Sequence, residues 1–311
     1  MRHGICILPE HPWAEAQHLW RQAEELGLDH AWTYDHLVWG GLPDAPWHST
    51  VATLTAAAMV TSRIGLGTLV SSPNFRHPVV LARDVVTLED ISGGRVLLGV
   101  GAGGDLDSGI LGEQLSRGER SRRFREFVPL LDRCLREDHV THEGEFYRAV
   151  DARNLTPADT PLLVAAEGPR AMRLAVQYAE GWVTTGPASG DWAERDTIET
   201  WWAGVAESAR WFSETEQEVR EAAGEDGGRP GAAGPAGGAT GPAGGAAPLD
   251  RYLTLDASGP ATVGSADFLA EQVGRAEELG FTDVIVHWPR PEPPYHWELA
   301  VLESYLASLG R

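Results

Sequence analysis

The chain has 311 residues, of which 42% are hydrophobic and 23% are charged, as in ordinary globular proteins. Its 45 acidic residues outweigh 25 basic residues, all of them arginine, and the formal net charge is −20. This charge argues against nucleic-acid and anionic-membrane partners, because a protein that binds them needs a basic face. The sequence has no run of about 18 apolar residues and no signal-peptide core, so we expect a cytoplasmic protein.

Short apolar runs alternate with longer runs of helical periodicity along almost the whole chain. Strands are predicted at 4–8, 31–34, 64–69, 96–100, 162–165, 181–184, 252–255 and 283–286. Helices are predicted at 13–26, 50–61, 78–91, 119–136, 169–179, 192–223, 266–279 and 296–309. Gly27 and Gly280 end two matching Ala-Glu-Glu-Leu-Gly phrases, which indicates one kind of helix-to-strand joint used twice.

Eight strands that alternate with eight helices predict an α/β fold, a (β/α)8 TIM barrel forming one domain over residues 1–311. A doubly wound parallel sheet is the alternative. Two insertions interrupt the alternation, a small hairpin at 140–149 and a Gly/Ala/Pro stretch at 224–248. The second stretch has too few packing side chains to order itself, so we expect a disordered loop within the barrel domain.

The two cysteines, Cys6 and Cys134, fall in a predicted strand and a predicted helix. Two cysteines are too few for a disulfide framework, and their spacing fits no metal or redox motif. We interpret them as buried free thiols of a protein in a reducing compartment.

In a barrel of this kind the active site lies at the C-terminal ends of the strands. Asp35 and His36 follow the second strand and pair a carboxylate with a group that titrates near neutral pH, so they are the acid/base candidates. The alternative is a helix-capping aspartate beside a surface histidine. His77 precedes Pro78 at a predicted helix start, and we interpret it as a capping or packing residue.

Two glycine-containing turns are candidates for cofactor binding. Residues 99–104 read Gly-Val-Gly-Ala-Gly-Gly after a strand, with no clear helix at their end, and we interpret them as room for a flat ring system near the strand backbone. Gly168, Pro169 and Arg170 place a helix start beside a fixed cation, which predicts an anion site, most simply for phosphate. The alternative is a plain Gly-Pro turn with an exposed arginine.

Several runs of the sequence together resemble the bacterial luciferase-like superfamily. They are RIGLGTLV at 63–70, FRHPVVLAR at 75–83, LEDISGGRV at 88–96, GVGAG at 99–103, and shorter matches at 34–36, 168–170 and 179–182. The resemblance covers residues 1–185 well and the remainder loosely. It implies a TIM-like barrel oxidoreductase that uses reduced flavin or coenzyme F420, and it is greatest for the F420-dependent branch.

The resemblance also implies roles for individual residues. His36 would act at the reacting centre, Asp35 would contact the cofactor, and a non-prolyl cis peptide would fall at Leu69–Val70. The loop before the fifth barrel helix would bind the cofactor phosphate. With His36 catalytic and no metal, the predicted cofactor-binding residues are Asp35, Leu69, Val70, Ser72, Gly101, Asp107, Ala165, Ala166, Glu167, Gly168, Pro169 and Arg170.

We therefore expect hydride transfer between F420 and a small organic substrate, in a homodimer that depends on a separate cofactor-reducing enzyme. The alternatives are a two-component monooxygenase that uses FMNH2 and a barrel retained for binding without catalysis. Sugar-phosphate dehydrogenases of this branch carry a glutamate that aligns with Gly104, so its absence argues against oxidation of a substrate like glucose 6-phosphate.

Overall fold

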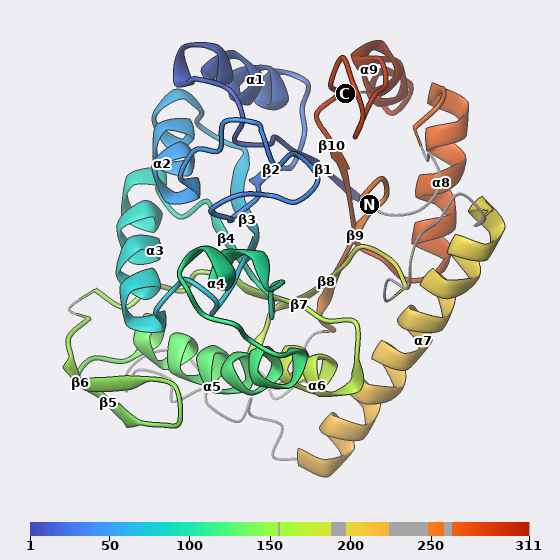
Figure 1. Ribbon diagram of the computed structural model, residues 1–311. Helices are drawn as coiled ribbons and strands as arrows, with labels where there is room; N and C mark the ends of the chain where they lie inside the picture. Colours follow the sequence, from blue (N-terminus) through green and yellow to red (C-terminus); the bar gives the residue numbers. More distant parts are fainter. Residues whose placement is uncertain (155, 188–196, 224–247, 258–262, 311) are drawn as a thin grey trace, which may run out of the picture.

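The computed structural model describes residues 1–154, 156–187, 197–223, 248–257 and 263–310. Eight parallel strands close into a barrel in the order β1-β10-β9-β8-β7-β4-β3-β2 (Figure 1). These strands are β1 (Arg2–Cys6), β2 (His30–Thr33), β3 (Gly65–Ser71), β4 (Val96–Val100), β7 (Leu162–Ala165), β8 (Gly181–Thr184), β9 (Asp250–Thr254) and β10 (Asp283–His287). The predicted TIM barrel is confirmed, and because β1 pairs with both β2 and β10, a doubly wound sheet is excluded.

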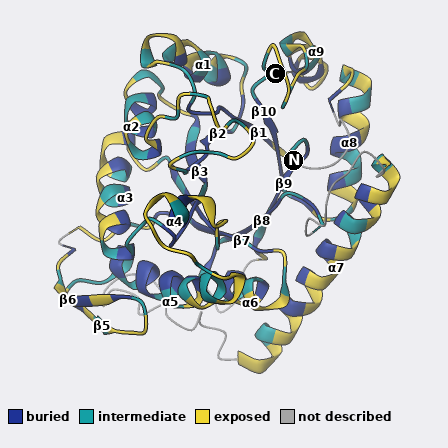
Figure 2. Ribbon diagram, viewed as in Figure 1, coloured by how far each residue is buried: buried dark blue, intermediate teal, exposed yellow. Residues whose placement is uncertain are grey.

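Helices surround the barrel with their inner faces buried and their outer faces exposed (Figure 2). They are α1 (Trp13–Glu25), α2 (Thr50–Val60), α3 (Pro78–Ser92), α4 (Leu106–Ile110), α5 (Arg117–Arg136), α6 (Pro169–Tyr178), α7 (Ile198–Ala223), α8 (Ala266–Glu278) and α9 (Leu299–Ser308). All eight predicted helices are present, although the predicted start of α7 at 192–196 lies outside the described residues. The sequence pattern gave no sign of α4, because five residues are too short for helical periodicity.

Two apolar cores stabilise this arrangement. The larger one packs the helices against the outside of the barrel, and the smaller one fills the barrel interior with residues that include Trp32, Tyr34 and Leu69. Cys6 and Cys134 are both buried and free, as predicted. Burial raises the pKa of the Cys134 thiol to about 11, so this side chain stays uncharged at neutral pH.

The two matching helix-to-strand joints have the same backbone geometry. Gly27 has a φ of 76° and Gly280 a φ of 83°, values that glycine adopts without steric cost. The amide of Leu28 then donates to the carbonyl oxygen of Ala23, four residues into the helix from the glycine, and an equivalent bond follows Gly280. The repeated phrase therefore marks a repeated βα unit, as predicted.

The predicted hairpin is also confirmed, as the antiparallel pair β5 (Val140–Glu143) and β6 (Arg148–Ala152). The carboxylate of Glu126 on α5 accepts a hydrogen bond from the amide of Tyr147 at 2.8 Å. The hydroxyl of Tyr147 donates to the carbonyl oxygen of Pro73 at 3.1 Å. The hairpin therefore braces the loop that follows β3.

The Gly/Ala/Pro stretch lies outside the described residues except for Pro248, so its predicted disorder stays a prediction. The elements on either side of it are in contact. Glu216 of α7 forms an ion pair with Arg251 at 3.0 Å and accepts from the amide of Leu249 at 3.4 Å. Among the described residues, no helix has the length and apolar character needed to cross a bilayer.

Candidate active site

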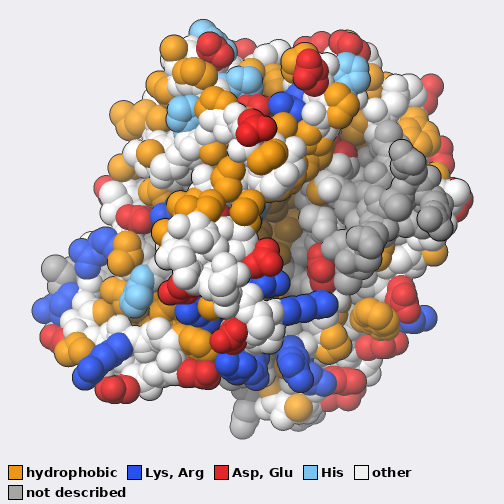
Figure 3. Space-filling model, in the orientation of Figure 1, with side chains coloured by type: hydrophobic (Ala, Val, Ile, Leu, Met, Phe, Trp, Pro, Cys, Tyr) orange, Lys and Arg blue, Asp and Glu red, His pale blue; other side chains and the backbone are white. Residues whose placement is uncertain are grey.

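The C-terminal ends of the barrel strands open on the side of the molecule where α4 lies (Figure 1). Polar residues of the loops that follow these strands form hydrogen bonds with one another there. Figure 3, drawn in the same orientation, shows a hollow near the centre of this face, with hydrophobic side chains in its depth. Acidic and arginine side chains lie along the edge nearest α5 and α6. We call this region the barrel mouth.

At the barrel mouth, His36 is oriented by a buried carboxylate. Oδ2 of Asp107, a residue of α4 that is 1% exposed, lies 2.7 Å from Nδ1 of His36, and Oδ1 accepts from the amide of Leu37 at 2.7 Å. An ionised carboxylate only accepts hydrogen bonds, so Nδ1 holds a proton, and Nε2 is the nitrogen that can gain or release one. The His36 side chain remains 24% exposed, which leaves Nε2 accessible for acid/base chemistry.

Asp107 was predicted to bind cofactor, and the structure places it behind His36 instead of in an open position. Its contact with a cofactor stays a prediction. Because α4 was not predicted, sequence analysis had no reason to pair these two residues.

Asp35 lies beneath the mouth and is also 1% exposed. It accepts from the hydroxyl of Ser71 at 2.5 Å and from two guanidinium nitrogens of Arg76 at 2.7 and 3.1 Å. Both oxygens are therefore used to fix the loop after β3, and a cofactor contact by this carboxylate stays a prediction. The next helix begins only at Thr50, so the helix-capping alternative for Asp35 is wrong.

His77 behaves as the sequence predicted. Its Nδ1 accepts a hydrogen bond from the amide of Val79 at 3.3 Å, which caps the start of α3. Its ring also contacts Tyr147 of the hairpin edge to face, with centroids 5.4 Å apart. Burial lowers the pKa of His77, which favours the neutral form that a capping acceptor requires.

The peptide bond between Leu69 and Val70 is cis, as the resemblance implied. The regular pairing of β3 with β4 is interrupted between Thr68 and Ser71. The peptide groups of Leu69 and Val70 therefore lie outside the strand ladder, at the end of the barrel where the mouth opens.

Three of the predicted cofactor residues meet at the floor of the mouth. A Cβ atom added to Gly101 would lie 2.7 Å from Cγ2 of Val70 and 3.3 Å from Cβ of Ala165, so these two side chains leave no room for a side chain at residue 101. The nearest neighbour of Gly101 is thus Val70 of the adjacent strand β3. The expectation that these glycines make room for a flat ring stays a prediction.

Asn74 connects the loops after β3 and β4, a role that sequence analysis missed. Its Nδ2 donates to the carbonyl oxygens of Ala102 at 3.1 Å and Gly104 at 2.5 Å, and its amide donates to Ser72 Oγ at 3.4 Å. Its own Oδ1 is buried and has no hydrogen-bond partner among the described residues. A buried acceptor without a donor is costly, and a ligand with an N–H or O–H group would satisfy it.

The start of α6 has the features of the predicted anion site. Gly168 is the N-cap and Pro169 the first helical residue, so the amides of Arg170 and Ala171 have no partner within the helix. Arg170 is exposed, and within the described parts of the chain no carboxylate lies within 4.0 Å of its guanidinium. The positive end of the helix and this cation together favour an anion.

Glu167 is the one acidic residue among the predicted anion-site positions. Burial raises the pKa of its carboxyl, and the positive charge of Arg117 at the start of α5 partly opposes this shift. The residue as a whole is exposed at the surface of the mouth. Arg117 lies close enough to Glu167 for its charge to act on the same site.

The remaining predicted residue of this loop, Ala166, has a structural role. Its amide donates to the carbonyl oxygen of Val183 at 3.2 Å, and its own carbonyl oxygen accepts from the indole of Trp182 at 2.8 Å. These bonds fix the chain just before the anion site. Ala166 therefore positions the loop through its backbone.

A second aspartate–histidine pair lies on the other side of Tyr34 from His36 along the chain of contacts, and the sequence did not indicate it. His287, the last residue of β10, has Nδ1 2.7 Å from Asp256 and Nε2 2.7 Å from the hydroxyl of Tyr34. The hydroxyl of Tyr295 lies 3.1 Å from that of Tyr34. Asp256 follows β9 and Tyr34 follows β2, so the strand-end rule pointed to these positions without pairing them.

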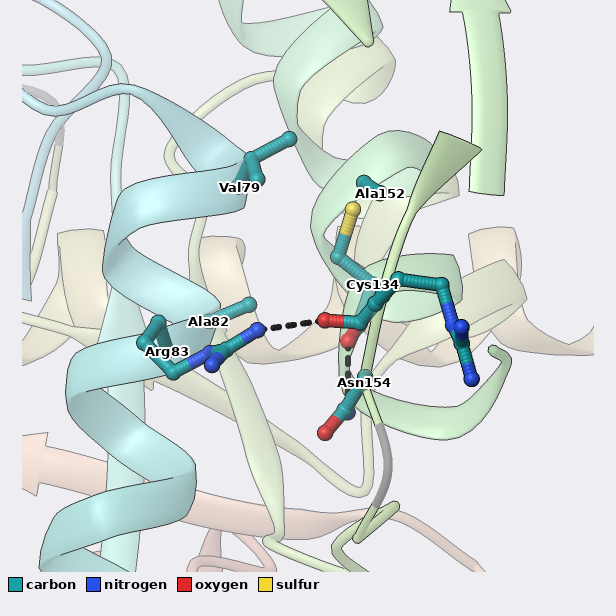
Figure 4. A pocket seen from close by; sticks show the side chains of 7 residues that line it. Val79, Ala82, Arg83, Cys134, Ala152 and Asn154 are labelled. Carbon is teal, nitrogen blue, oxygen red and sulfur yellow. Dashed lines mark hydrogen bonds between the residues drawn. The ribbon is translucent and has the colours of Figure 1, made fainter. Parts of the chain in front are cut away.

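A separate cavity between α3, α5 and the hairpin is not a candidate site. It has a volume of about 20 Å³, room for one water molecule. Figure 4 shows two of the bonds that close it, from Arg83 to the carbonyl oxygen of Arg153 and from Asn154 to that of Cys134. It is too small for a cofactor or an organic substrate.

Comparisons with known proteins agree with this geometry. A family model described as luciferase-like monooxygenase matches residues 1–220. An F420-dependent glucose-6-phosphate dehydrogenase from Beutenbergia cavernae is 40% identical over 173 residues, which are 52% of this chain and 50% of the relative. A 5,10-methylenetetrahydromethanopterin reductase from Methanopyrus kandleri is 29% identical over 194 residues, 57% of this chain and 53% of the relative. The chain thus spans about half the length of the curated relatives it matches.

Solved structures support the fold over the whole chain. The coenzyme F420 dependent tetrahydromethanopterin reductase from Methanopyrus kandleri has a TM-score of 0.69 at 18% identity and covers 100% of this chain and 97% of its own. A monooxygenase from Streptomyces bottropensis has a TM-score of 0.70 at 18% identity, covering 99% and 97%. At such identities the likeness concerns the fold.

Proposed function

Because the chain belongs to the luciferase-like monooxygenase family, we propose that it is an oxidoreductase that transfers a hydride between coenzyme F420 and a small organic substrate. The observation that carries this proposal is the His36–Asp107 pair at the barrel mouth, 2.7 Å apart, with one imidazole nitrogen left accessible. The names of the curated relatives, F420-dependent dehydrogenases and a reductase, support it. When bound, F420 would supply a ring carbon that accepts or releases the hydride.

The residues at the mouth fit such a cofactor. The peptide groups of Leu69 and Val70, which lie outside the strand ladder, would face its ring, and the buried Oδ1 of Asn74 offers an acceptor for one of its N–H or O–H groups. The start of α6 and Arg170 would hold its phosphate. These assignments place an anionic group on the side of the mouth where the arginines lie.

His36 would donate or accept the substrate proton at Nε2. Asp107 is the group that makes this possible, because it fixes the ring tautomer and stabilises the imidazolium that forms when Nε2 takes a proton. A positioned acid/base group of this kind contributes roughly 10²- to 10⁴-fold to a rate.

The experiment that tests the proposal is a fluorescence titration of the purified, cofactor-free protein with F420 and, separately, with FMN. We expect tryptophan quenching by F420 at lower concentration than by FMN. Arg170→Ala should weaken F420 binding by about tenfold, the effect of losing one charged hydrogen bond. Tight binding of FMN without binding of F420 would instead favour the FMNH2-dependent monooxygenase.

Arg173→Ala is the matched control for this titration. Arg173 lies one turn further along α6 and forms an exposed ion pair with Glu218 at 2.6 Å. Its removal should leave F420 affinity within about twofold, because exposed pairs contribute little. Equal losses in the two variants would show a general charge effect and not a phosphate site.

The proposal extends to the assembly. We infer a homodimer that receives its cofactor from a separate reducing enzyme in the cytoplasm, as the family resemblance implies. Light scattering on the purified protein measures the mass directly, and a monomer would contradict the dimer.

A further inference from the structure

Resting on the function proposed above, we propose that Tyr295 donates a hydrogen bond to the oxygen of an uncharged hydroxyl or carbonyl substrate, and that Asp256, His287 and Tyr34 hold Tyr295 ready to do so. We call these four residues the tyrosine array. Tyr295 is thus a substrate-binding residue, and the other three are positioning residues.

The hydrogen-bond directions in the array follow from its inner end. The two oxygens of Asp256 accept from the amide of His287 at 2.9 Å and face its Nδ1 at 2.7 Å. When the His287 ring holds a single proton, Nδ1 therefore carries it and Nε2 can only accept. The hydroxyl of Tyr34, 2.7 Å away, must donate to it.

This arrangement leaves the hydroxyl of Tyr295 as the one donor in the array that can be redirected to a substrate. Once Tyr34 has donated to His287, its oxygen can only accept, so without substrate Tyr295 donates to it across 3.1 Å. That contact is the longest in the array. Rotation of the Tyr295 hydroxyl about its C–O bond is enough to redirect the hydrogen to a substrate oxygen, and no backbone change is required.

Packing holds the Tyr295 ring while its hydroxyl remains free to turn. The ring stacks on His287 with centroids 3.6 Å apart and planes 4° apart, and Trp39 lies nearly parallel to it at 6.0 Å and 11°. His287 is fully buried and Tyr34 is 8% exposed. Burial also raises the pKa of both tyrosines, so both hydroxyls keep their protons at neutral pH.

His36 and Tyr295 both adjoin Tyr34, which places the acid/base group and the proposed oxygen donor at the same part of the mouth. The rings of Tyr34 and His36 meet edge to face with centroids 6.1 Å apart. In this proposal one substrate oxygen lies near both His36 Nε2 and the Tyr295 hydroxyl, because both residues adjoin Tyr34. This pairing suits a carbon–oxygen group that gains or loses a proton as the hydride moves.

The surroundings of the array select an uncharged substrate. The apolar residues packed beside it are Trp39, Leu42 and Trp47. The nearby cation, Arg290, is already engaged, since it contacts Glu10 at 2.7 and 3.0 Å and three carbonyl oxygens of its own loop. This side of the mouth thus has no described cation available for a phosphate, in contrast to the side formed by α6.

The test uses 2-cyclohexen-1-one as the uncharged probe and glucose 6-phosphate as the charged one, with and without F420. We expect the ketone to quench tryptophan fluorescence and glucose 6-phosphate not to compete with it. In the infrared spectrum the carbonyl stretch of the bound ketone should shift to lower wavenumber in the wild type and return toward its free position in Tyr295→Phe, with affinity reduced about tenfold.

Tyr305→Phe is the matched control. It removes a buried tyrosine–histidine hydrogen bond of similar length, 2.8 Å to His3, a residue of β1 near the opposite end of the barrel. It should leave the carbonyl shift and ketone affinity unchanged, and both variants should bind F420 like the wild type. A merely structural role of Tyr295 would alter F420 and ketone binding together, with no change specific to the carbonyl stretch.

Three results would overturn the inference: no binding of the ketone, tighter binding of glucose 6-phosphate, or an unchanged carbonyl stretch in Tyr295→Phe. Nitrogen NMR of labelled histidine in the cofactor-free protein is a further test. We expect His287 to be protonated at Nδ1, and the Nε2–H tautomer would contradict the array. Because the ketone and NMR measurements also run without F420, they can succeed when the F420 titration fails, which separates this inference from the proposed function.

Discussion

At the scale of single residues, the site depends on partners that are distant in sequence. Asp35 and His36 could be recognised because they follow a predicted strand, and that reasoning needs only local sequence. The carboxylate that orients His36 comes from α4, 71 positions further along the chain. Sequence analysis ranked Asp107 as a cofactor residue because nothing local distinguishes a carboxylate that orients a histidine from one that binds a ligand.

The His36–Asp107 pair gives the first prediction. His36→Asn should lower kcat by roughly 10²- to 10⁴-fold, because the group that exchanges the substrate proton is lost. Asp107→Asn should lower kcat less, by about tenfold or more, since the ring remains but its tautomer is no longer fixed. F420 affinity should stay within about twofold in His36→Asn, as steady-state kinetics and fluorescence titration would measure, and the same titration of Asp107→Asn tests the cofactor contact predicted for Asp107.

The control for this pair is His139→Asn on the hairpin. His139 also contacts an aspartate through Nδ1, at 2.6 Å from Asp151, but both residues are exposed and lie outside the mouth. We expect wild-type kcat. A loss of activity equal to that of His36→Asn would show that the effect reflects stability and not chemistry.

Two glycines of one loop give a second prediction at this scale. A Cβ at Gly101 would meet Val70 at 2.7 Å, whereas one at Gly104 would meet nothing within 4 Å. Gly101→Ala should therefore destabilise the fold by about 1–3 kcal/mol, the range for overpacking, and Gly104→Ala should change the free energy of unfolding by less than about 0.5 kcal/mol. Urea denaturation measures both, and equal effects would contradict the close contact at the floor of the mouth.

At the scale of elements, the sequence predicted what periodicity and end signals encode. The barrel strands, the eight longer helices and the hairpin show such periodicity or end signals in the sequence. Gly27 and Gly280 mark the ends of α1 and α8, where each helix joins the next strand. The short helix α4 and the tyrosine array do not, because α4 is too short to show helical periodicity and the array joins His287 of β10 to residues of the loops after β2, β9 and β10. Closure of the barrel creates those contacts, so no single element contains the signal.

The joint between α1 and β3 gives a prediction about pH. Burial alone would raise the pKa of Glu24, but hydrogen bonds from the amides of Ile64, Arg63 and Ser62 outweigh it and lower the value to about 2. The stabilisation is therefore fully present above the unfolded pKa near 4.5 and is lost as pH falls toward 2. Glu24→Gln should unfold on the order of 1 kcal/mol more easily at pH 7, after allowance for solvent screening, with the difference shrinking below pH 4.

Glu25→Gln is the control for this measurement, since Glu25 is the exposed neighbour on the same helix. Denaturant unfolding at pH 7 and at pH 3.5 should show no difference between this variant and the wild type. A Glu24→Gln effect that grew as the pH fell would contradict the assigned direction of the pKa shift.

At the scale of the whole molecule, the alternation of strands and helices predicted the fold, whereas length and net charge were compatible with several fold classes. The net charge of −20 argued against anionic partners in general, but the proposed cofactor is itself anionic. The structure accommodates both observations, because Arg170 and the start of α6 form a local positive site on an acidic protein. Composition averages over the surface and could not reveal such a site.

The predicted single domain gives a prediction for the Gly/Ala/Pro stretch. Glu216, about two turns before the end of α7, holds this helix beside the start of β9, so a flexible linker of about eight residues, with a reach of roughly 26 Å, should replace residues 224–247. Calorimetry should show one unfolding transition with Tm unchanged or slightly raised, and F420 binding should persist. Two transitions, or loss of binding, would contradict a single barrel domain with a dispensable loop.

The most direct test of the central claim is a crystal structure of the protein soaked with F420. The account predicts density for the cofactor ring against the Leu69–Val70 peptide, beside His36, and density for its phosphate at the amides of Arg170 and Ala171. Clear density for the cofactor elsewhere, or none at the barrel mouth at saturating F420, would contradict it.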